Sequence, residues 1–313
     1  ARLRIVSDLG DPGISVVIPT HGGRVSLVAS VESLLVDQDG PLEIIVVSDG
    51  DGSDTREALR HVNDTRLRVY ERPKGGANAA RNYGLSQARF PWVAFVDDDD
   101  VPRQNWSRVF RRLITQHTVV ATAAIAHWWG GILSYEKTCS LSLTDPGMEA
   151  SRLMAGAFIV RKELLNAVGG YDTGIVTSEN QDLGLRIIEQ LRRTGMSASV
   201  VSASDEVVID VYTDEAHSRA SRYGDKWAAT ATIFLARYSL RMDADPGSRA
   251  AYLRVIARQE RIHGNLRAAR RAAWAATRSE WYNPRNVRSL LLAALPRLEP
   301  SVRKWVESSS RRS

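Results

Sequence analysis

The chain has 313 residues, of which 43% are hydrophobic, and this composition excludes a disordered protein and provides a core for one large α/β domain or two modest ones. Lysine and arginine outnumber aspartate and glutamate by 42 to 36, and the charge of +6 favours anionic partners such as nucleotide phosphates, nucleic acid or acidic lipid headgroups. The single cysteine, Cys139, excludes an intrachain disulfide and a thiolate zinc cluster. Without an apolar signal segment, a cytosolic location is favoured.

The first hundred residues are predicted to alternate between strands and helices joined by short loops. Strands are predicted at residues 14–18, 42–47, 66–70 and 92–96, with helices at 25–34, 54–59 (with Asp54 as a cap) and 77–88. Such alternation indicates a mostly parallel sheet covered on both faces. Ligands bind such sheets at the carboxyl ends of the strands.

The second part of the chain is predicted to complete the sheet and then to become helical. Its predicted elements are a helix at 106–115, a strand at 119–127, a polar insertion without clear period at 130–149, a strand at 153–160, a helical turn at 162–167, a helix at 181–194 and a strand region at 198–211. From Trp227 onward the sequence is rich in alanine and arginine, with a last helix after Pro284. The longest apolar stretch near the C-terminus, 290–295, is too short to span a bilayer.

Four consecutive carboxylates, Asp97 to Asp100, follow the apolar strand that begins at Trp92. Like charges crowded at a strand end repel one another, and a hard divalent cation whose shell is completed by an anionic ligand would relieve the repulsion. The alternative is an acidic solvated loop.

Two further loops contain polar groups at predicted strand or helix ends. Asp49 ends the second strand, where a carboxylate can accept a hydrogen bond from a pyrimidine imide or from guanine, although Gly50-Asp51-Gly52 alone indicates only a turn. Lys74-Gly75-Gly76 leads into a helix that contains Arg81, so backbone N–H groups and two basic side chains could face a diphosphate, or form a plain connection. Walker and Gly-x-Gly-x-x-Gly motifs are absent, which argues against kinases, P-loop hydrolases and dinucleotide dehydrogenases.

In order, a Pro-Thr strand end, an Asp-Gly strand end and Ala-x-Ala-Ala-Arg-Asn-x-Gly leading to the aspartates resemble the inverting glycosyltransferases of family 2, which have the GT-A fold. The resemblance runs from about Ile14 to Tyr212 and recurs at 156–162, 169–172 and 178–186. It implies an α/β GT-A domain, Rossmann-like and mostly parallel, over residues 1–225. The nucleotide-sugar half would be 14–100 and the acceptor half 101–225, followed by a helical region at 226–313.

Carried over to this chain, the resemblance implies a nucleoside pocket lined by Pro19, Thr20 and Asp49, with Arg81 near the base or the phosphates. The implied donor is a nucleoside-diphosphate sugar, with UDP- or dTDP-sugars favoured and a GDP-sugar as the alternative.

The acidic run matches the family's Asp-x-Asp metal motif. Asp97 and Asp99 match its ends, Asp98 fills the variable middle, and Asp100 caps the following segment or tunes the cluster. Mg²⁺ or Mn²⁺ bridging Asp99 and both phosphates would neutralise charge on the leaving diphosphate. His217 lies in the loop at 214–219, where the family often places a group near the phosphates or the metal; a solvated loop is the alternative.

The family's catalytic base is usually the aspartate of a Glu-Asp pair, and here that position is Asn180. An amide cannot accept the proton, so Glu179, Asp182 or another group must serve. We favour Glu179 because it immediately precedes the expected position. For Asp182 the alternative is a structural role, as a carboxylate on the first turn of a helix.

Two regions bear on the acceptor and on partners. His127, Trp128 and Trp129 either stack on a sugar or apolar acceptor, or pack in the core. The arginine-rich helices at 254–278 form an amphipathic bundle with a solvated face, or else contact a membrane or a partner. Nucleic acid binding is disfavoured because no recognition motif accompanies the charge. The sequence is also consistent with a homo-oligomer.

The sequence therefore predicts a metal-dependent inverting glycosyltransferase that moves a sugar to an acceptor hydroxyl by direct displacement. The acceptor would be a saccharide, a lipid-linked saccharide or a natural product, and the composition fits a bacterial cytosolic enzyme, soluble or peripheral to the inner face of the membrane. A nucleotide-sugar-binding protein without transferase activity is the alternative that Asn180 raises. A nucleotidyltransferase is a third, but His21-Gly22-Gly23-Arg24 is a poor version of the glycine-rich loop that it needs.

Overall fold

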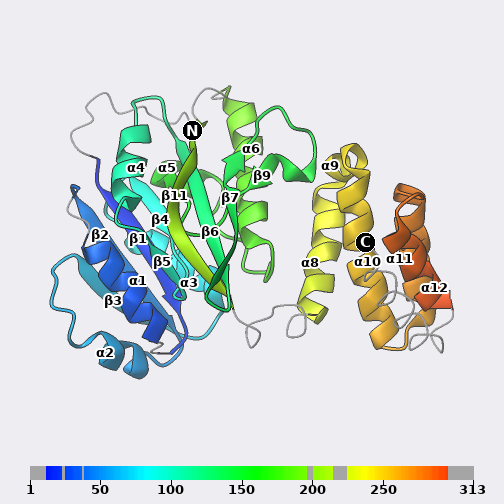
Figure 1. The fold of residues 1–313 in the computed structure, drawn as a ribbon, viewed down its shortest axis with the longest axis horizontal. Helices are drawn as coiled ribbons and strands as arrows, with labels where there is room; N and C mark the ends of the chain where they lie inside the picture. The colour runs from blue at the N-terminus through cyan, green and yellow to red at the C-terminus, as the bar shows by residue number, and fades with distance from the viewer. Residues whose placement is uncertain (1–11, 23–24, 37–38, 196–199, 214–223, 295–313) are drawn as a thin grey trace. The chain divides into compact units, whose positions relative to one another are not determined.

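The computed structural model describes residues 12–22, 25–36, 39–195, 200–213 and 224–294 (Figure 1). The chain divides into two compact units. The first comprises residues 1–145 and 149–218, and the second comprises 146–148 and 219–313.

Four parallel strands form the N-terminal part of a nine-stranded sheet in the order β3-β2-β1-β4. They are β1 (Ile14–Thr20), β2 (Leu42–Asp49), β3 (Leu67–Arg72) and β4 (Trp92–Phe95). Every residue of β1, β2 and β4 is buried, as expected for strands whose two faces are both covered. These runs of apolar residues therefore specify the centre of the sheet.

The remaining strands make the sheet mixed. β10 (Phe158–Arg161) pairs antiparallel with β4 and with β6 (Val120–Trp129), and β11 (Val200–Thr213) runs parallel to β6. Two antiparallel strands complete it, β5 (Asp100–Pro102) on β11 and β7 (Ile132–Thr138) on β6. A separate small ladder joins β8 (Ser140–Leu141) and β9 (Ser151–Arg152), with a 3-10 turn at Met148–Ala150.

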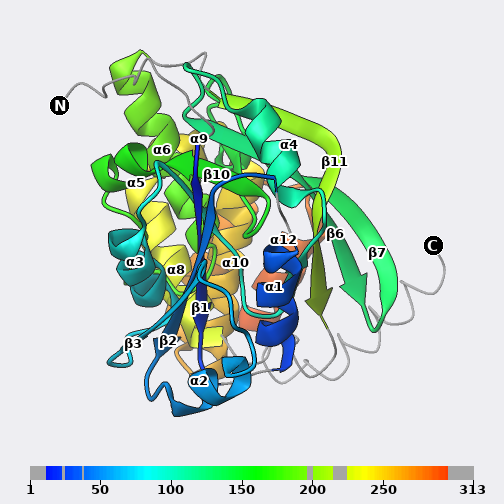
Figure 2. The same ribbon diagram turned by 90° about the vertical axis from the view of Figure 1, so that its left-hand side faces the viewer.

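Helices cover both faces of the sheet, as predicted. They are α1 (Val25–Leu35), α2 (Ser53–Leu59), α3 (Ala77–Gln87), α4 (Trp106–Leu113), α5 (Lys162–Ala167) and α6 (Glu179–Thr194). Val16 and Ile18 belong to the core cluster that includes residues of α1 and α4, whereas Val17 faces α3. Alternate residues of β1 thus point to opposite helical layers, and Figure 2 shows α1 and α3 on opposite sides of β1.

The second unit is helical. It contains α8 (Gly224–Arg237), α9 (Ser239–Ala244), α10 (Pro246–Ile262), α11 (Leu266–Ser279) and α12 (Pro284–Ala294). Small side chains let α10, α11 and α12 pack closely, with Ala257, Ala269, Ala273 and Ala293 buried together. Among the described residues, none of the helices combines the length and the apolar character that a membrane crossing requires.

Several local predictions were wrong. The insertion at 130–149 was expected to lack periodic structure, yet Gly130 and Gly131, with φ of +55° and +80°, form the turn that starts strand β7. The strand expected at 153–160 begins only at Phe158, after Gly156 with φ of +77°. Asp54 lies within the first turn of α2, and Gly52 occupies the N-cap position instead.

Candidate active site

The predicted site residues of the first three loops meet at the carboxyl ends of β1, β2 and β4. The Thr20 hydroxyl, at the end of β1, donates to Asp98 Oδ2 over 2.6 Å. The next residue, His21, lies with its Nδ1 2.9 Å from the carbonyl oxygen of Asp49, at the end of β2. One short segment therefore contacts both the acidic run and the predicted base-recognition loop.

Asp49 is buried and is held by the loop that leads into α3. Its Oδ1 accepts from the Gly75 N–H at 2.9 Å, its Oδ2 accepts from the Gly76 N–H at 2.7 Å, and Arg72 forms an ion pair with it. The backbone N–H groups that were expected to face a diphosphate thus point to a carboxylate of the chain itself, while the Lys74 side chain is exposed. Oδ1 also accepts from Arg72, so Oδ2 is the oxygen with a second lone pair that can accept from a base.

Arg81 joins the acidic run to the start of α6. It is 3% exposed, and it donates to Asp97 Oδ1 at 2.6 Å and to Asn78 Oδ1 at 2.8 Å. Glu179 Oε1 lies 3.6 Å from the same guanidinium, which also lies over the ring of Tyr171. Burial works to lower the pKa of Arg81, but Asp97, Tyr171 and Glu179 hold this pKa above its ordinary value, so the group stays charged.

Two asparagines of α3 fix the turn that precedes α6. Asn82 donates to the Tyr171 carbonyl and accepts from the Tyr171 N–H, both at 2.8 Å. Asn78 donates to the carbonyl oxygens of Asp172 and Ile175 at 2.9 and 2.6 Å. No local signal in the sequence predicts these roles of Asn78 and Asn82, because their partners lie about 90 residues away along the chain.

The first turn of α6 presents Glu179 and Asn180. Ser178, just before them, has φ of +57° and is the only residue other than glycine with positive φ in the described part of the chain. Such backbone strain clusters at functional sites. The Tyr171 hydroxyl donates to Asn180 Oδ1 at 2.7 Å, and burial raises the pKa of Tyr171, which keeps this donor protonated.

Asp182 lies in the packing of α6. It is 1% exposed, and its Oδ2 accepts from Arg186 Nε at 2.8 Å. Arg186 also donates to the carbonyl oxygens of Val168 and Gly170, both at 2.7 Å. Asp182 therefore holds Arg186, which connects α6 to the turn at residues 168–170. We interpret Asp182 as structural and keep Glu179 as the candidate base.

The carboxylates of the acidic run turn to different partners, which relieves their mutual repulsion. Asp97 pairs with Arg81, Asp98 accepts from Thr20, and Asp99 lies half-buried in the turn. Asp100, which was predicted to cap the following segment or to tune the cluster, begins strand β5 and is 4% exposed, with its carbonyl oxygen accepting from Ser30.

The donor set suits a metal that a ligand helps to hold. Within the described ranges, no group of three or more His, Cys, Asp or Glu side chains is arranged to hold a metal ion, and His217 lies outside those ranges. Carboxylate oxygens suit Mg²⁺ or Mn²⁺, but the shell would need oxygens from a phosphate ligand.

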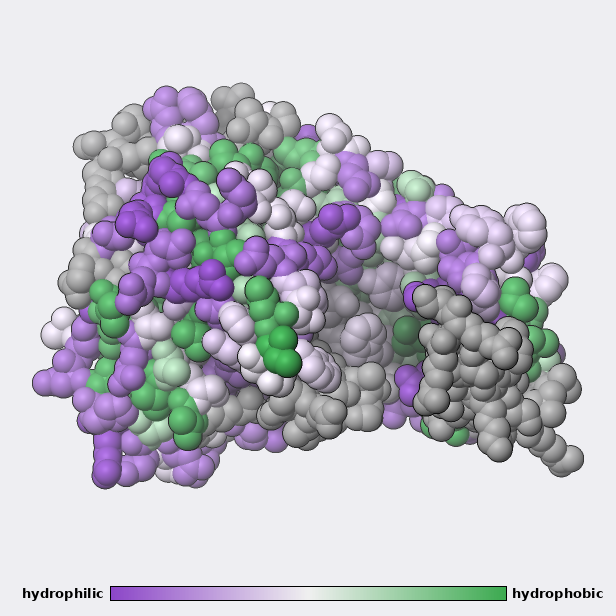
Figure 3. Space-filling model, in the orientation of Figure 1, coloured by the Kyte–Doolittle hydropathy of each residue, from purple (hydrophilic) through white to green (hydrophobic). Residues whose placement is uncertain are grey.

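Aromatic side chains line the end of β6 beside this run. The His127 ring stacks on Tyr135, with centroids 4.6 Å apart, and the Trp128 ring stacks on Tyr212 at 6.3 Å. Trp129 is 43% exposed. In the sheet register, Trp128 pairs with Tyr212 and Asp100 pairs with the preceding Val211, so these aromatic rings lie next to the acidic run and largely outside the core. Figure 3 shows a hydrophobic strip over the neighbouring end of β7.

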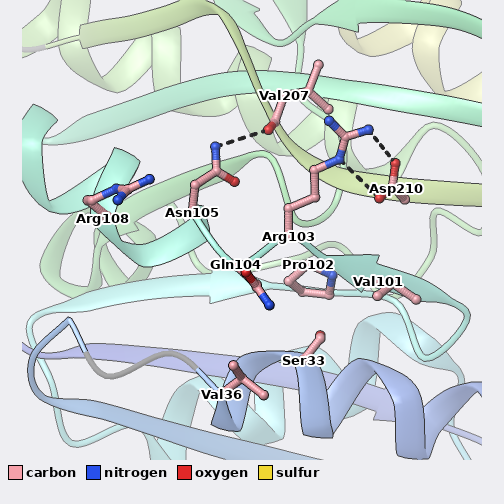
Figure 4. A pocket seen from close by; sticks show the side chains of 10 residues that line it. All are labelled: Ser33, Val36, Val101, Pro102, Arg103, Gln104, Asn105, Arg108, Val207 and Asp210. Carbon is pink, nitrogen blue, oxygen red and sulfur yellow. Dashed lines mark hydrogen bonds and ion pairs between the residues drawn. The ribbon is translucent and has the colours of Figure 1, made fainter.

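A separate cavity of about 770 Å³ lies beside β5, between α1 and the start of α4 (Figure 4). Arg103 extends along it and binds Asp210 through two hydrogen bonds of 3.0 and 2.7 Å. None of the predicted site residues lines this cavity.

Comparison with known proteins finds a family model that matches part of the chain. Residues 15–144 match the model described as glycosyl transferase family 2. A segment of 95 residues is 37% identical to glycosyltransferase GlyG of Streptococcus pneumoniae serotype 4, covering 29% of this chain and 32% of that protein. The chain thus spans about a third of the length of the curated relatives that it matches first.

Solved structures resemble nearly the whole chain. Staphylococcus aureus TarS 1-349 in complex with UDP-GlcNAc covers 96% of this chain and 92% of that one, with a TM-score of 0.57 at 18% identity. Mannosyltransferase PcManGT from Pyrobaculum calidifontis, in complex with GDP-Man and Mn²⁺, covers 95% and 83%, with a TM-score of 0.52 at 16% identity. These similarities confirm the predicted GT-A fold.

Proposed function

Because residues 15–144 match the model of glycosyl transferase family 2, we propose that the chain is a glycosyltransferase that moves a sugar from a nucleoside-diphosphate donor to an acceptor hydroxyl. The observation that carries the proposal is the position of Arg81. This guanidinium binds Asp97 of the acidic run and lies 3.6 Å from Glu179, so the proposed leaving-group side and the proposed base share one buried contact.

The donor would bind at the ends of β1 and β2. Pro19, Thr20 and Asp49 would line the nucleoside pocket, with Asp49 accepting from the base through the remaining lone pair of Oδ2. The similar structures with bound UDP-GlcNAc and GDP-Man support a nucleotide-sugar ligand. We favour a UDP- or dTDP-sugar over a GDP-sugar because the one lone pair left on Asp49 Oδ2 matches a single imide N–H rather than the two donors of guanine. Lys74, exposed at the start of α3, would approach the phosphates.

Asp99, with Asp97 beside it, would hold Mg²⁺ or Mn²⁺ together with the donor phosphates. The bound metal would neutralise the charge that develops on the departing diphosphate. A structure similar to this chain holds Mn²⁺ together with GDP-Man, which supports this assignment.

The acceptor hydroxyl would lose its proton to Glu179 while it attacks the anomeric carbon in one displacement, which inverts the configuration. General-base catalysis of this kind contributes roughly 10²- to 10⁴-fold in rate. Asn180 cannot accept a proton, and its Oδ1 is engaged by Tyr171. Trp128 and Tyr212 would offer stacking surfaces to a saccharide acceptor or to a lipid-linked saccharide.

Calorimetric titration of the purified chain with UDP, dTDP and GDP, each with Mn²⁺, tests the proposal. We expect saturable binding of at least one nucleotide that weakens when the metal is chelated. Asp99→Asn should remove the metal dependence, whereas Asp205→Asn, an exposed carboxylate of β11, should leave binding unchanged. Failure of all three nucleotides to bind would refute the proposal.

A further inference from the structure

The exposed side of α11 carries a regular stripe of arginine and tryptophan. Four exposed side chains follow one another at spacings of four, three and four residues, which places them on one face of the helix: Arg267, Arg271, Trp274 and Arg278. Beyond the helix end, Trp281 and Tyr282 are 75% and 71% exposed. The opposite face of α11 consists of buried alanines, so packing of the helix does not explain the stripe.

The arginines of this stripe are not part of an ordinary solvated ion-pair surface. Between Leu266 and Ala294 the sequence has six arginines and a single carboxylate, Glu280. Arg267, Arg271 and Arg278 form no ion pair with any residue that the structure describes, and Glu280 accepts from Asn283. An exposed helix normally alternates charges of opposite sign at such spacings. Among the residues that the structure describes, the positive charges of Arg267, Arg271 and Arg278 are therefore not compensated by a carboxylate.

The tryptophans add a second and independent property. Trp274 is 56% exposed and lies on the same face of α11 as the three arginines, with Arg271 and Arg278 about one turn away on either side. Indole rings are favoured where apolar and wet environments meet, and arginine stems can lie on apolar surface while the guanidinium reaches phosphate. A lipid headgroup layer offers both environments at once, whereas single-stranded nucleic acid would need an open stacking cleft.

We propose that the Arg–Trp face, defined as Arg267, Arg271, Trp274, Arg278 and Trp281, docks the chain on the headgroup region of an anionic lipid bilayer. The face would lie flat on the surface, with phosphates against the guanidinium groups and indole rings at the level of the headgroups. No crossing of the bilayer is involved.

Sedimentation of the purified full chain with lipid vesicles tests this proposal. We expect binding to phosphatidylcholine vesicles that contain about a third phosphatidylglycerol, little binding to phosphatidylcholine alone, and weaker binding as salt is raised. Each arginine near such a surface is worth about five-fold in partition, so Arg271→Gln with Arg278→Gln should weaken binding by roughly 25-fold. Trp274→Ala should weaken binding further.

Arg89→Gln with Arg193→Gln is the matched control, because it also removes two positive charges, from exposed positions just beyond α3 and on α6. Circular dichroism and nucleotide titration would verify that each variant is folded. The proposal is overturned if the wild type ignores anionic vesicles at low salt, if the double variant binds them as the wild type does, or if the control loses as much. It is also overturned if the same substitutions abolish tight binding of single-stranded nucleic acid, or a dimer in solution, and leave vesicle binding intact.

Discussion

Replacing Arg81 with methionine tests whether one buried guanidinium holds the two acidic sides of the site together. Methionine keeps much of the side-chain volume but removes the hydrogen bonds to Asp97 and Asn78, at 2.6 and 2.8 Å, and the attraction to Glu179. The Asp97 carboxylate then loses its cation in a setting where that carboxylate is only 26% exposed.

The magnitude follows from this burial. Removing one partner of a buried ion pair costs about 3 to 5 kcal/mol in the free energy of unfolding. Water can reach part of Asp97, so we expect the lower end of that range, about 3 kcal/mol. In a domain of this size each kcal/mol lowers Tm by about 2 to 4 °C, so the melting temperature should fall by roughly 6 to 12 °C.

Thermal unfolding followed by circular dichroism measures this shift. The double variant Arg81→Met with Asp97→Asn should be more stable than Arg81→Met alone, because the carboxylate of Asp97 is no longer left without its cation. Arg89→Met, an exposed arginine just beyond α3, should change stability by no more than about 0.5 kcal/mol. The reasoning fails if Arg81→Met has the same melting temperature as the wild type. It also fails if the losses of unfolding free energy in Arg81→Met and in Asp97→Asn simply add in the double variant.

Three other variants or treatments have definite expected outcomes. Glu179→Gln should lower turnover by roughly 10²- to 10⁴-fold; if instead the wild type is inactive and Asn180→Asp creates activity, the chain is a nucleotide-sugar-binding protein. Gly84→Ala should lower the free energy of unfolding in urea by about 1 to 3 kcal/mol, although alanine has the better helix propensity. The added Cβ would lie 2.3 Å from Val17 Cγ1. A higher urea midpoint for the variant would contradict this. Burial raises the pKa of Cys139 from 9.0 to about 12, so iodoacetamide should label this thiol at about pH 9 only after unfolding. The free energy of unfolding should fall as the pH rises from 9 to 12, because the thiol of the unfolded chain ionises first. Rapid labelling of the native chain would count against this.

The sequence was sufficient to predict the parallel centre of the sheet. The runs that became β1, β2 and β4 are apolar at nearly every position, which only a doubly covered strand tolerates, and each ends in a polar loop. Because parallel strands end at one edge, the prediction that Thr20, Asp49 and the acidic run would gather there needed no knowledge of distant contacts.

Features that depend on long-range pairing could not be predicted in this way. β5 has three residues, and only its pairing with β11, about a hundred residues later, makes it a strand. The glycines at the start of α3 have free N–H groups in any local description, and only the fold brings Asp49 to them. A local pattern shows which groups are available, but tertiary contacts decide what occupies them.

The contacts that α3 makes with the turn before α6 couple the positions of Asp97 and Glu179. Asn78, Arg81 and Asn82 lie three and four residues apart on one side of a short helix, and together they reach both the strand-end carboxylate Asp97 and the chain that leads into Glu179. Because of these contacts, we expect a displacement of this helix to move both carboxylates in the same direction, so that the distance between them changes less than their positions do. The fold therefore constrains the distance between the carboxylates of Asp97 and Glu179 more tightly than the position of either one.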